Sequence, residues 1–270
     1  MNSYKSASTI SYEESSCRAY EQELIVEEPL AIRIEGKPYS VVMRTPGKEI
    51  FHVAGFCLAE GLVEHPDDFT TIGHCSEMDA NVANVTLTPE RRKKVADLLE
   101  RRGFVSQTSC GICGKELIKD LYQILTPIKD KTKISASRAL ECVSRLPEHQ
   151  ELYKTTHAAH GVLLFDSHLN IMSVAEDVGR HNALDKVIGE VFMAGNISDA
   201  KLAVLSSRIS YELVQKAARA SLTFLIGMSR PTALAVELGR ALNMTLSCVK
   251  QNDLLVFCRQ ERLNGRCDEK

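Results

Sequence analysis

The stretch KLAVLSSRISYELVQKAARASLTFLIGMSRPTALAVELG, residues 201–239, decides the fold. Its runs KLAVLSS and LTFLIGM have the length and apolar residue types of buried strands. A segment with helical spacing follows each run, from about residue 209 and from Pro231. The same alternation extends outward, with strands expected at GVLLFD, NIMSVAED, MTLSCV and LLVFC and a helix from about residue 182. This order predicts a three-layer α/β/α unit, and the close final pair of strands predicts a mixed sheet.

The N-terminal half has a different pattern. LIVEEPLAIRIEGKPYSVVMRTPG, residues 24–47, is typical of a β-hairpin with a turn at Gly36-Lys37, and Tyr39, Val41 and Met43 alternate on its second strand. Other elements are expected in order: a helix that ends at Gly61, strands around 70–78 and 82–88, a helix from Thr88-Pro89 to Gly103, and helices near 115–125 and 136–146.

These patterns divide the chain into four parts. We expect a disordered tail over residues 1–20, an N-terminal α+β portion over 21–130, an α/β domain over 131–262 and a second tail over 263–270. A chain of 270 residues is long enough for one large domain or two small ones.

Composition excludes several classes of protein. The hydrophobic share of 44% and charged share of 25% are ordinary for a soluble globular chain, and a net charge of −2 gives no basis for non-specific nucleic-acid binding. No apolar stretch approaches the roughly 20 residues of a membrane span, and the polar N-terminus lacks an apolar signal region. Nine cysteines in a chain of this size are expected to be mostly free thiols. We therefore expect a cytoplasmic protein with no membrane contact.

One cysteine pair differs from the others in its surroundings. Cys110 and Cys113 lie in SCGICGK, residues 109–115, among glycines rather than core residues. Such a pair can hold a metal, act as a redox dithiol or carry a group on sulfur. His157 and His160 could complete a zinc site, but their spacing is shorter than usual and the zinc-deaminase pattern is missing. We therefore expect no metal site.

Three arginines follow strands in the C-terminal half: Arg180, Arg208 and Arg230. Helix N-termini, serine hydroxyls and guanidinium groups suit phosphate oxygens, and such junctions line the ligand crevice of open α/β sheets. The segments therefore suggest a phosphorylated ligand. In the alternative interpretation, Ser206 and Ser229 are helix N-caps and the arginines are solvated. The polar cluster that contains His181 could likewise be a site or a capping cluster; its other members are Glu176, Asp177, Arg180, Asn182 and Asp185.

Together these segments resemble the FdhD family of formate dehydrogenase accessory sulfurtransferases. The matching segments fall in order over about residues 24–260: RTPG (44–47), GFCLAEGLV (55–63), SCGICGK (109–115), THAAHG (156–161), AEDVGRHNALDKVIG (175–189), SSRISYELVQKAA (206–218) and PTALAVELG (231–239). The resemblance implies a cytidine-deaminase-like fold without the deaminase zinc, and a homodimer.

The resemblance also implies an activity. The family takes persulfide sulfur from a cysteine desulfurase and passes it to the molybdenum cofactor, bis-molybdopterin guanine dinucleotide, which is then inserted into formate dehydrogenase. By position, Cys110 matches the cysteine that carries the persulfide and Cys113 matches the second cysteine of the pair. The family's cofactor-binding stretch falls on CVKQND: Cys248, Val249, Lys250, Gln251, Asn252 and Asp253. The cofactor's phosphates and guanine are expected at this stretch and at Arg180, His181, Ser206, Arg208, Ser229 and Arg230.

The chain departs from the family pattern at three places, one of which is ARASLTFLIGMSRPT, residues 218–232, where the family has Ala-Gly-Ile-Pro and Ser-Ala-Pro-Thr. Ser207 stands where a glycine is expected, and CVKQND lacks the glycine, phenylalanine and arginine of the common loop. Two other functions compete with sulfur transfer: a chaperone that only holds the cofactor, and a small zinc enzyme of the deaminase fold.

Overall fold

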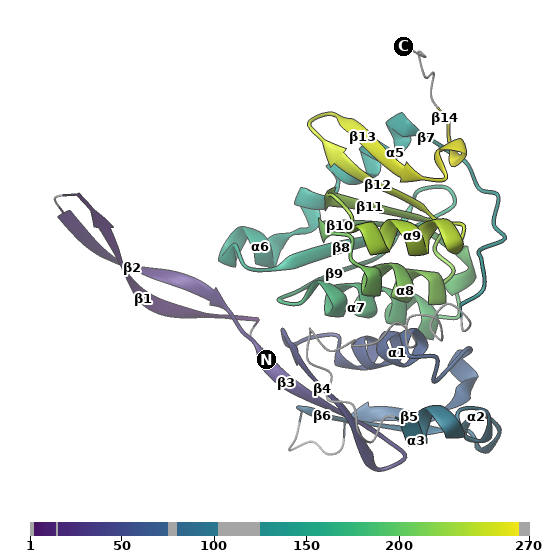
Figure 1. Ribbon diagram of the computed structural model, residues 1–270. Coiled ribbons are helices and arrows are strands. Elements are labelled where there is room, and N and C mark those ends of the chain that lie inside the picture. The colour runs from purple at the N-terminus through teal and green to yellow at the C-terminus, as the bar shows by residue number, and fades with distance from the viewer. Residues whose placement is uncertain (1–2, 15, 75–79, 102–124, 265–270) are drawn as a thin grey trace.

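The C-terminal half of the molecule is built on a six-stranded mixed sheet. The computed structural model describes residues 3–14, 16–74, 80–101 and 125–264 (Figure 1). The strand order is β13-β12-β11-β10-β8-β9, in which β10, β11 and β12 run parallel and the other pairs are antiparallel. The strands are β8 (His160–Asp166), β9 (Ile171–Asp177), β10 (Ala200–Arg208), β11 (Phe224–Ser229), β12 (Thr245–Lys250) and β13 (Asp253–Cys258). The prediction of a mixed sheet is confirmed.

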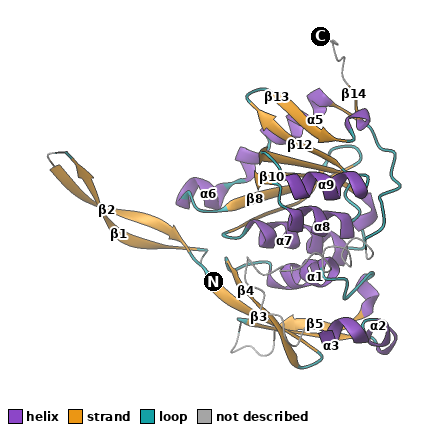
Figure 2. Ribbon diagram, viewed as in Figure 1, coloured by secondary structure: helices purple, strands orange, loops and turns teal. Residues whose placement is uncertain are grey.

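Helices cover both faces of this sheet (Figure 2). Alternate residues of β8 show the two faces, because Val162 and Leu164 belong to one hydrophobic core and Leu163 and Phe165 to the other. On the first face lie α7 (Arg180–Met193), α8 (Tyr211–Arg219) and α9 (Ala233–Ala241); on the second lies α5 (Ala136–Ser144). The predicted three-layer α/β/α arrangement is confirmed.

The N-terminal half contributes a second sheet of four strands, in the order β4-β3-β6-β5. The strands are β3 (Glu28–Ile34), β4 (Lys37–Arg44), β5 (Phe69–His74) and β6 (Val82–Leu87). Leu30, Ile32 and Ile34 alternate on β3 and point into the same core as helix α1 (Glu49–Ala59). Helix α1 also packs along α7 and so joins the two halves.

Two glycines permit this close packing of α1 and α7. A Cβ atom on Gly189 would meet the carbonyl oxygen of Phe51, and one on Gly55 would meet the carbonyl oxygen of Asp185. Any larger residue at either position would force the helix backbones apart. The large core that contains both helices is therefore continuous across the two halves.

The predicted hairpin over residues 24–47 forms, but its turn and its second strand differ from expectation. The turn residues are Glu35 and Gly36, both with positive φ, as a two-residue type I′ turn requires. The register then shifts by one residue between Ile32 and Arg33, so that one extra residue sits on β4. Because side chains alternate with a period of two, this bulge reverses the faces beyond it. Val41 and Met43 consequently face outward.

The predicted tail over residues 1–20 is wrong for its described part. Strands β1 (Tyr4–Glu13) and β2 (Ser16–Ile25) pair in antiparallel register and form a hairpin that extends away from the body (Figure 1). Neither strand has a buried residue, and Ser6, Ser8, Glu21 and Glu23 interrupt the apolar side chains on one face, which is why alternation did not reveal the strands. The second expected tail begins in the described part with β14 (Leu263–Asn264), which pairs with β7 (Ile134–Ser135).

Other differences concern where helices begin and end. The helix expected from Thr88 is split at Val95 into α2 (Pro89–Lys94) and α3 (Ala96–Arg101), with Thr88 as the N-cap as predicted. Helix α6 (Glu151–Thr156) was not predicted. Short 3₁₀ helices lie at Pro66–Asp68, Leu146–His149, Ile197–Asp199 and Gln260–Arg262. The helix expected near 115–125 lies outside the described residues, apart from Leu125.

Candidate functional site

The predicted cofactor-binding residues lie at the end of the six-stranded sheet where the parallel strands have their carboxyl ends. This end of the sheet is called the sheet edge below. Parallel strands β10, β11 and β12 end at the same edge, with Arg208, Ser229 and Lys250 as their last residues. The antiparallel strand β8 begins there with His160. Strand β9 ends there, directly before α7. Neighbouring strands lie about 4.8 Å apart, so the row from His160 to Lys250 spans roughly 15 Å. The geometry suits an extended ligand.

At the centre of the edge, a serine connects two strands. Ser206 Oγ accepts a hydrogen bond of 2.9 Å from the Gly161 amide and lies 3.5 Å from His160 Nδ1. Burial lowers the pKa of His160, and the neighbouring Arg180 guanidinium and His181 lower it further. His160 is therefore a neutral imidazole beside the Arg180 guanidinium at neutral pH, able to accept or donate one hydrogen bond.

His181 lies in the first turn of α7 and faces the start of α8. Its Nε2 lies 3.3 Å from Ser210 Oγ and 3.5 Å from a carboxylate oxygen of Glu212. The hydrogen bond to His181 is the main cause that lowers the pKa of Glu212 to about 2. Ser210 and Glu212 are site residues that sequence reasoning missed. The sequence feature that could have indicated them is the segment ISYE directly after Arg208, which places a hydroxyl and a carboxylate at the start of the helix.

The three predicted arginines reach this edge from different elements. Arg180 begins α7, and its buried Nε has no hydrogen-bond partner among the described residues. Arg208 and Ser229 are register partners at the ends of β10 and β11, and Arg230 follows directly. Arg208 and Arg230 are both exposed. Guanidinium groups with free donors at a strand edge are suited to bind phosphate or carboxylate oxygens.

The stretch from Cys248 to Asp253 forms the end of the β12–β13 hairpin, where Lys250 and Asp253 are register partners. Lys250, Gln251, Asn252 and Asp253 are exposed at the same edge as Arg230, and Val249 is half-buried. Cys248 is buried within the sheet, and burial raises the pKa of its thiol despite the nearby Arg230. A ligand at this hairpin would therefore meet its turn rather than the thiol.

Ser206 and Ser229 are not helix N-caps, so this part of the alternative interpretation is wrong, whereas its other part, solvated arginines, fits the exposure of Arg208 and Arg230. Both serines lie in strands, and the N-caps of α8 and α9 are Ser210 and Thr232. The sequence placed these helices about two residues too early, because β10 ends at Arg208 and β11 ends at Ser229 and a short loop follows each strand.

Part of the polar cluster around His181 is structural. Asp177 is fully buried, with its carboxylate 2.7 Å from Lys186 Nζ and 3.1 Å from the Thr45 amide. Asp177 also accepts hydrogen bonds from the Gly179 amide and from Asn182 Nδ2. These contacts connect α7 to the RTPG segment of the N-terminal half. The expectation that Asp177 caps the helix is wrong, because the N-cap of α7 is Gly179 and no side chain caps that helix; the Asp177 carboxylate forms a buried ion pair instead.

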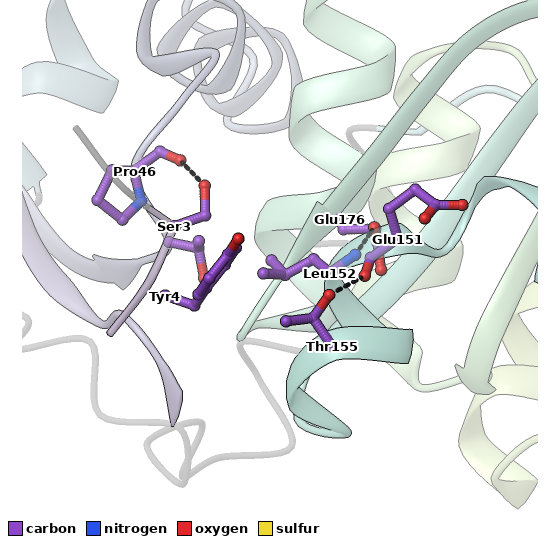
Figure 3. Close-up of a pocket in the computed structure, with 8 residues that line it drawn as sticks. Ser3, Tyr4, Pro46, Glu151, Leu152, Thr155 and Glu176 are labelled. Atoms are coloured by element: carbon purple, nitrogen blue, oxygen red, sulfur yellow. Dashed lines mark hydrogen bonds between the residues drawn. The ribbon is translucent and has the colours of Figure 1, made fainter. Parts of the chain in front are cut away.

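A cavity of about 400 Å³ lies beside the end of β9 (Figure 3). Its walls come from the base of the β1–β2 hairpin, the Thr45-Pro46 turn and helix α6. The Glu176 carboxylate accepts hydrogen bonds from the amides of Leu152 and Tyr153 at the start of α6. Burial raises the pKa of Glu176. This carboxylate thus fixes α6 against the sheet.

Cys110 and Cys113 lie outside the described residues, so the geometry of the CxxC segment stays a prediction. Within residues 3–14, 16–74, 80–101 and 125–264, no three His, Cys, Asp or Glu side chains are grouped as metal ligands would be. In the same ranges no helix is long and apolar enough to cross a membrane.

Comparisons with known proteins identify the family of the chain. Residues 25–264 match the FdhD/NarQ family. The chain is 37% identical over 253 residues to the sulfur carrier protein FdhD of Mycobacterium tuberculosis, covering 89% of this chain and 91% of that protein. It is 31% identical over 245 residues to the protein of the same name from Xanthomonas campestris, covering 90% and 86%.

A solved structure has the same fold. The crystal structure of a putative formate dehydrogenase accessory protein from Desulfotalea psychrophila superposes with a TM-score of 0.78, covering 97% of this chain and 100% of that one. The two sequences are 18% identical, so this likeness concerns the fold.

Proposed function

The chain belongs to the FdhD/NarQ family, and on that premise we propose that it is a sulfur carrier that serves the maturation of formate dehydrogenase. In this proposal a cysteine desulfurase supplies the sulfur in the cytoplasm, where thiols stay reduced. The acceptor is the molybdenum cofactor, bis-molybdopterin guanine dinucleotide, which the chain holds as cargo. The observation that carries the proposal is the row of arginines, serines and histidines along one sheet edge in a member of a family of sulfur carriers.

Loading of sulfur is a thiol exchange at Cys110. The Cys110 thiolate attacks the terminal sulfur of the desulfurase persulfide, forms a new S–S bond and releases the desulfurase cysteine as a thiolate. No electrons leave the pair of proteins in this step. The product is a persulfide on Cys110.

Delivery of sulfur requires two electrons if it leaves as sulfide. The Cys113 thiolate attacks the Cys110 sulfur of the persulfide, a Cys110–Cys113 disulfide forms, and the terminal sulfur departs as hydrosulfide. Two thiols are thereby oxidised and one sulfur is reduced. A cellular dithiol then restores the reduced pair.

The sheet edge holds the cargo. Arg180, Arg208 and Arg230 offer guanidinium donors for pyrophosphate oxygens, and an orphaned buried donor on Arg180 supports an anion at that end. The exposed turn at residues 250–253 follows β12, the strand beside the one that ends before Arg230, and offers amide and carboxylate groups for the guanine. Ser207 donates its hydroxyl to the Arg208 carbonyl, so the serine that replaces the expected glycine turns its side chain into the loop.

Isotope-labelled sulfur tests the loading step. The purified chain is incubated with a cysteine desulfurase and sulfur-labelled cysteine, and the labelled peptide is identified by mass spectrometry. We expect label on the peptide that contains Cys110, and no label on that peptide in Cys110→Ala. Cys17→Ala is the matched control, because Cys17 is an exposed free thiol in the hairpin and should leave loading unchanged. Full loading of Cys110→Ala would contradict the assignment.

The same variants distinguish sulfur transfer from the chaperone function. A chaperone would keep formate dehydrogenase active in cells that carry Cys110→Ala and lose it in cells that carry Arg208→Ala with Arg230→Ala. A sulfur carrier requires both sets of residues.

A further inference from the structure

Met228 is exposed at the sheet edge although it belongs to β11, an inner strand of the six-stranded sheet. It is 41% exposed, and within strands β8 to β13, all of which the structure describes, it is the one exposed large apolar side chain. The chain continues directly into Ser229 and Arg230, which belong to the expected cofactor-binding set. A single exposed apolar residue is normal on a protein surface, so the surroundings of Met228 decide whether it has a role.

Met228 lies on the face of the sheet that α5 covers. Phe224 and Ile226 of the same strand belong to the core between the sheet and α5, and alternation along the strand places Met228 on that face too. The strand ends at Ser229. Met228 is therefore the last side chain of β11 on this face, where the core ends and the sheet edge begins.

Two neighbouring strands extend this apolar surface. Strands β11, β12 and β13 lie side by side (Figure 1). Gly227 and Cys248 are register partners, so Met228 and Val249 are the next residues on adjacent strands, and Val249 is the register partner of Leu254. Val249 and Leu254 are half-buried and pack against the core on the α5 face. Met228, Val249 and Leu254 are called the apolar row below; at about 4.8 Å between strands, the row is roughly 10 Å long.

Polar groups border the apolar row at the sheet edge. Arg230 follows β11, and Arg208 ends the neighbouring strand as the register partner of Ser229. The exposed turn from Lys250 to Asp253 joins β12 to β13 directly beside Val249 and Leu254. The row thus has guanidinium donors near one end and the amide and carboxylate groups of the turn near the other.

This combination fits the base of a purine nucleotide. A purine has two apolar aromatic faces, and its polar groups lie around the rim of the ring. Thioether and aliphatic side chains can cover such a face, and the flexible methionine side chain adapts to its shape. The phosphates of the same nucleotide would meet the arginines, and the rim of the base would meet the turn. An inorganic anion would use the arginines alone and would leave the row exposed.

We propose that the base of the nucleotide stacks on the apolar row, and that Met228 makes the sheet edge select a nucleotide over inorganic pyrophosphate. The inference rests on the proposed function, in which the cargo at this edge carries guanine. It adds a residue outside the expected cofactor-binding set, one that contacts the face of the base and not the phosphates.

Calorimetry with two probes, guanosine diphosphate and inorganic pyrophosphate, tests the role of Met228. In the wild-type chain guanosine diphosphate should bind more tightly. Met228→Ser should weaken its binding by about fivefold or more, because the thioether contact and the buried apolar area are lost. The same variant should change the affinity for pyrophosphate by less than about twofold, because that probe contacts the arginines and not the row.

Three further variants separate the contributions. Met228→Leu keeps an apolar side chain of similar volume and should bind guanosine diphosphate within about threefold of the wild-type chain. Arg208→Ala should weaken the binding of both probes, because both carry phosphates. Met43→Ser is the matched control, because Met43 is a methionine of similar exposure, 48%, on the four-stranded sheet, and it should change neither affinity.

The outcomes distinguish this inference from the function on which it rests. If Met228→Ser left the binding of guanosine diphosphate unchanged, or weakened both probes equally, the apolar row would not be the seat of the base, and the proposed function would stand. A wild-type chain that bound neither probe would overturn the proposed cargo site and the inference together.

Methyl NMR locates the base directly. The chain is labelled at its methionine methyl groups, and the Met228 signal is assigned by its loss in Met228→Leu. Guanosine diphosphate should shift this signal upfield, because a methyl group over an aromatic face is shielded by the ring current, and pyrophosphate should not. A Met228 signal that stays in place with guanosine diphosphate, or that both probes shift equally, would overturn the inference.

Discussion

The two sides of the segment EDVGRHNALDK, residues 176–186, use similar charged residues for opposite purposes. The inward side carries Asp177, Asp185 and Lys186, all buried, and the outward side carries Arg180 and His181 at the sheet edge. Lys186 Nζ lies 2.7 Å from Asp177, and Lys216 Nζ lies 2.7 Å from Asp185. Each buried carboxylate in this segment thus has a cation beside it.

The outward side has fewer intramolecular partners. The Nε of Arg180 has no partner among the described residues, and neither Arg208 nor Arg230 forms an ion pair in the described part of the chain. A buried charge must be paired because of its desolvation cost, whereas an exposed cation stays available for a ligand. Burial therefore separates the structural half of the motif from the binding half.

The largest effect is expected from breaking the inward pair. Lys186→Ala leaves the fully buried Asp177 carboxylate without its cation, and we expect a loss of about 3–5 kcal/mol in the free energy of unfolding. Urea denaturation followed by circular dichroism measures it. The control is Lys48→Ala, which removes a half-exposed partner of Glu190 and should cost about 1 kcal/mol or less. Equal losses in both variants would show that burial does not distinguish the two pairs.

A smaller effect is expected from pH. His52 is fully buried beside Lys186 and Lys216, and burial followed by these cations holds its pKa well below its usual range. The unfolded chain takes up this proton below about pH 6.5 while the folded chain does not. Stability should therefore be at its full value above that pH and fall as pH decreases, by about 1.4 kcal/mol per pH unit for one group.

Two measurements check the origin of this slope. Unfolding free energies between about pH 7 and pH 5 should decrease toward acid, and His160 adds to the effect because its pKa is lowered too. His52→Leu should reduce the slope whatever it does to stability at neutral pH. An unchanged slope in that variant would assign the pH dependence to other groups.

The smallest effect on stability is expected at the outward side. Arg208→Ala and Arg230→Ala remove exposed side chains and should change the free energy of unfolding by less than about 0.5 kcal/mol. Guanosine diphosphate carries the guanine and the phosphates of the proposed cofactor and serves as the probe. Each substitution should lower the affinity for it by roughly tenfold or more, because each removes charge-assisted hydrogen bonds to phosphate. Isothermal titration calorimetry measures the affinity. Arg138→Ala on α5, on the other face of the sheet, is the control and should bind normally.

Much of this edge could be predicted from the sequence. The apolar runs of β8 to β13 alternate with helices, so the arginines after them had to meet at the edge where parallel strands end. The contact of His181 with Ser210 and Glu212 could not be predicted, because it joins α7 to the start of α8. His181 and Ser210 are 29 residues apart in the chain. Contacts of this kind depend on how α7 and α8 pack.

The N-terminal half was predicted less completely. Alternation identified the hairpin over residues 24–47, but not the single extra residue on β4 that turns Val41 and Met43 outward. The β1–β2 hairpin was not predicted, because its strands have no buried face in one chain and hydrophobic periodicity reports burial.

The sequence by itself determined the order of strands and helices, the mixed α/β sheet and the membership of a family of sulfur carriers, because apolar periodicity and local motifs are written along the chain. The tertiary structure decided which charges are buried and paired, which arginines remain free at the edge, and which face of β4 meets solvent. Those properties depend on desolvation and register between segments far apart in the sequence.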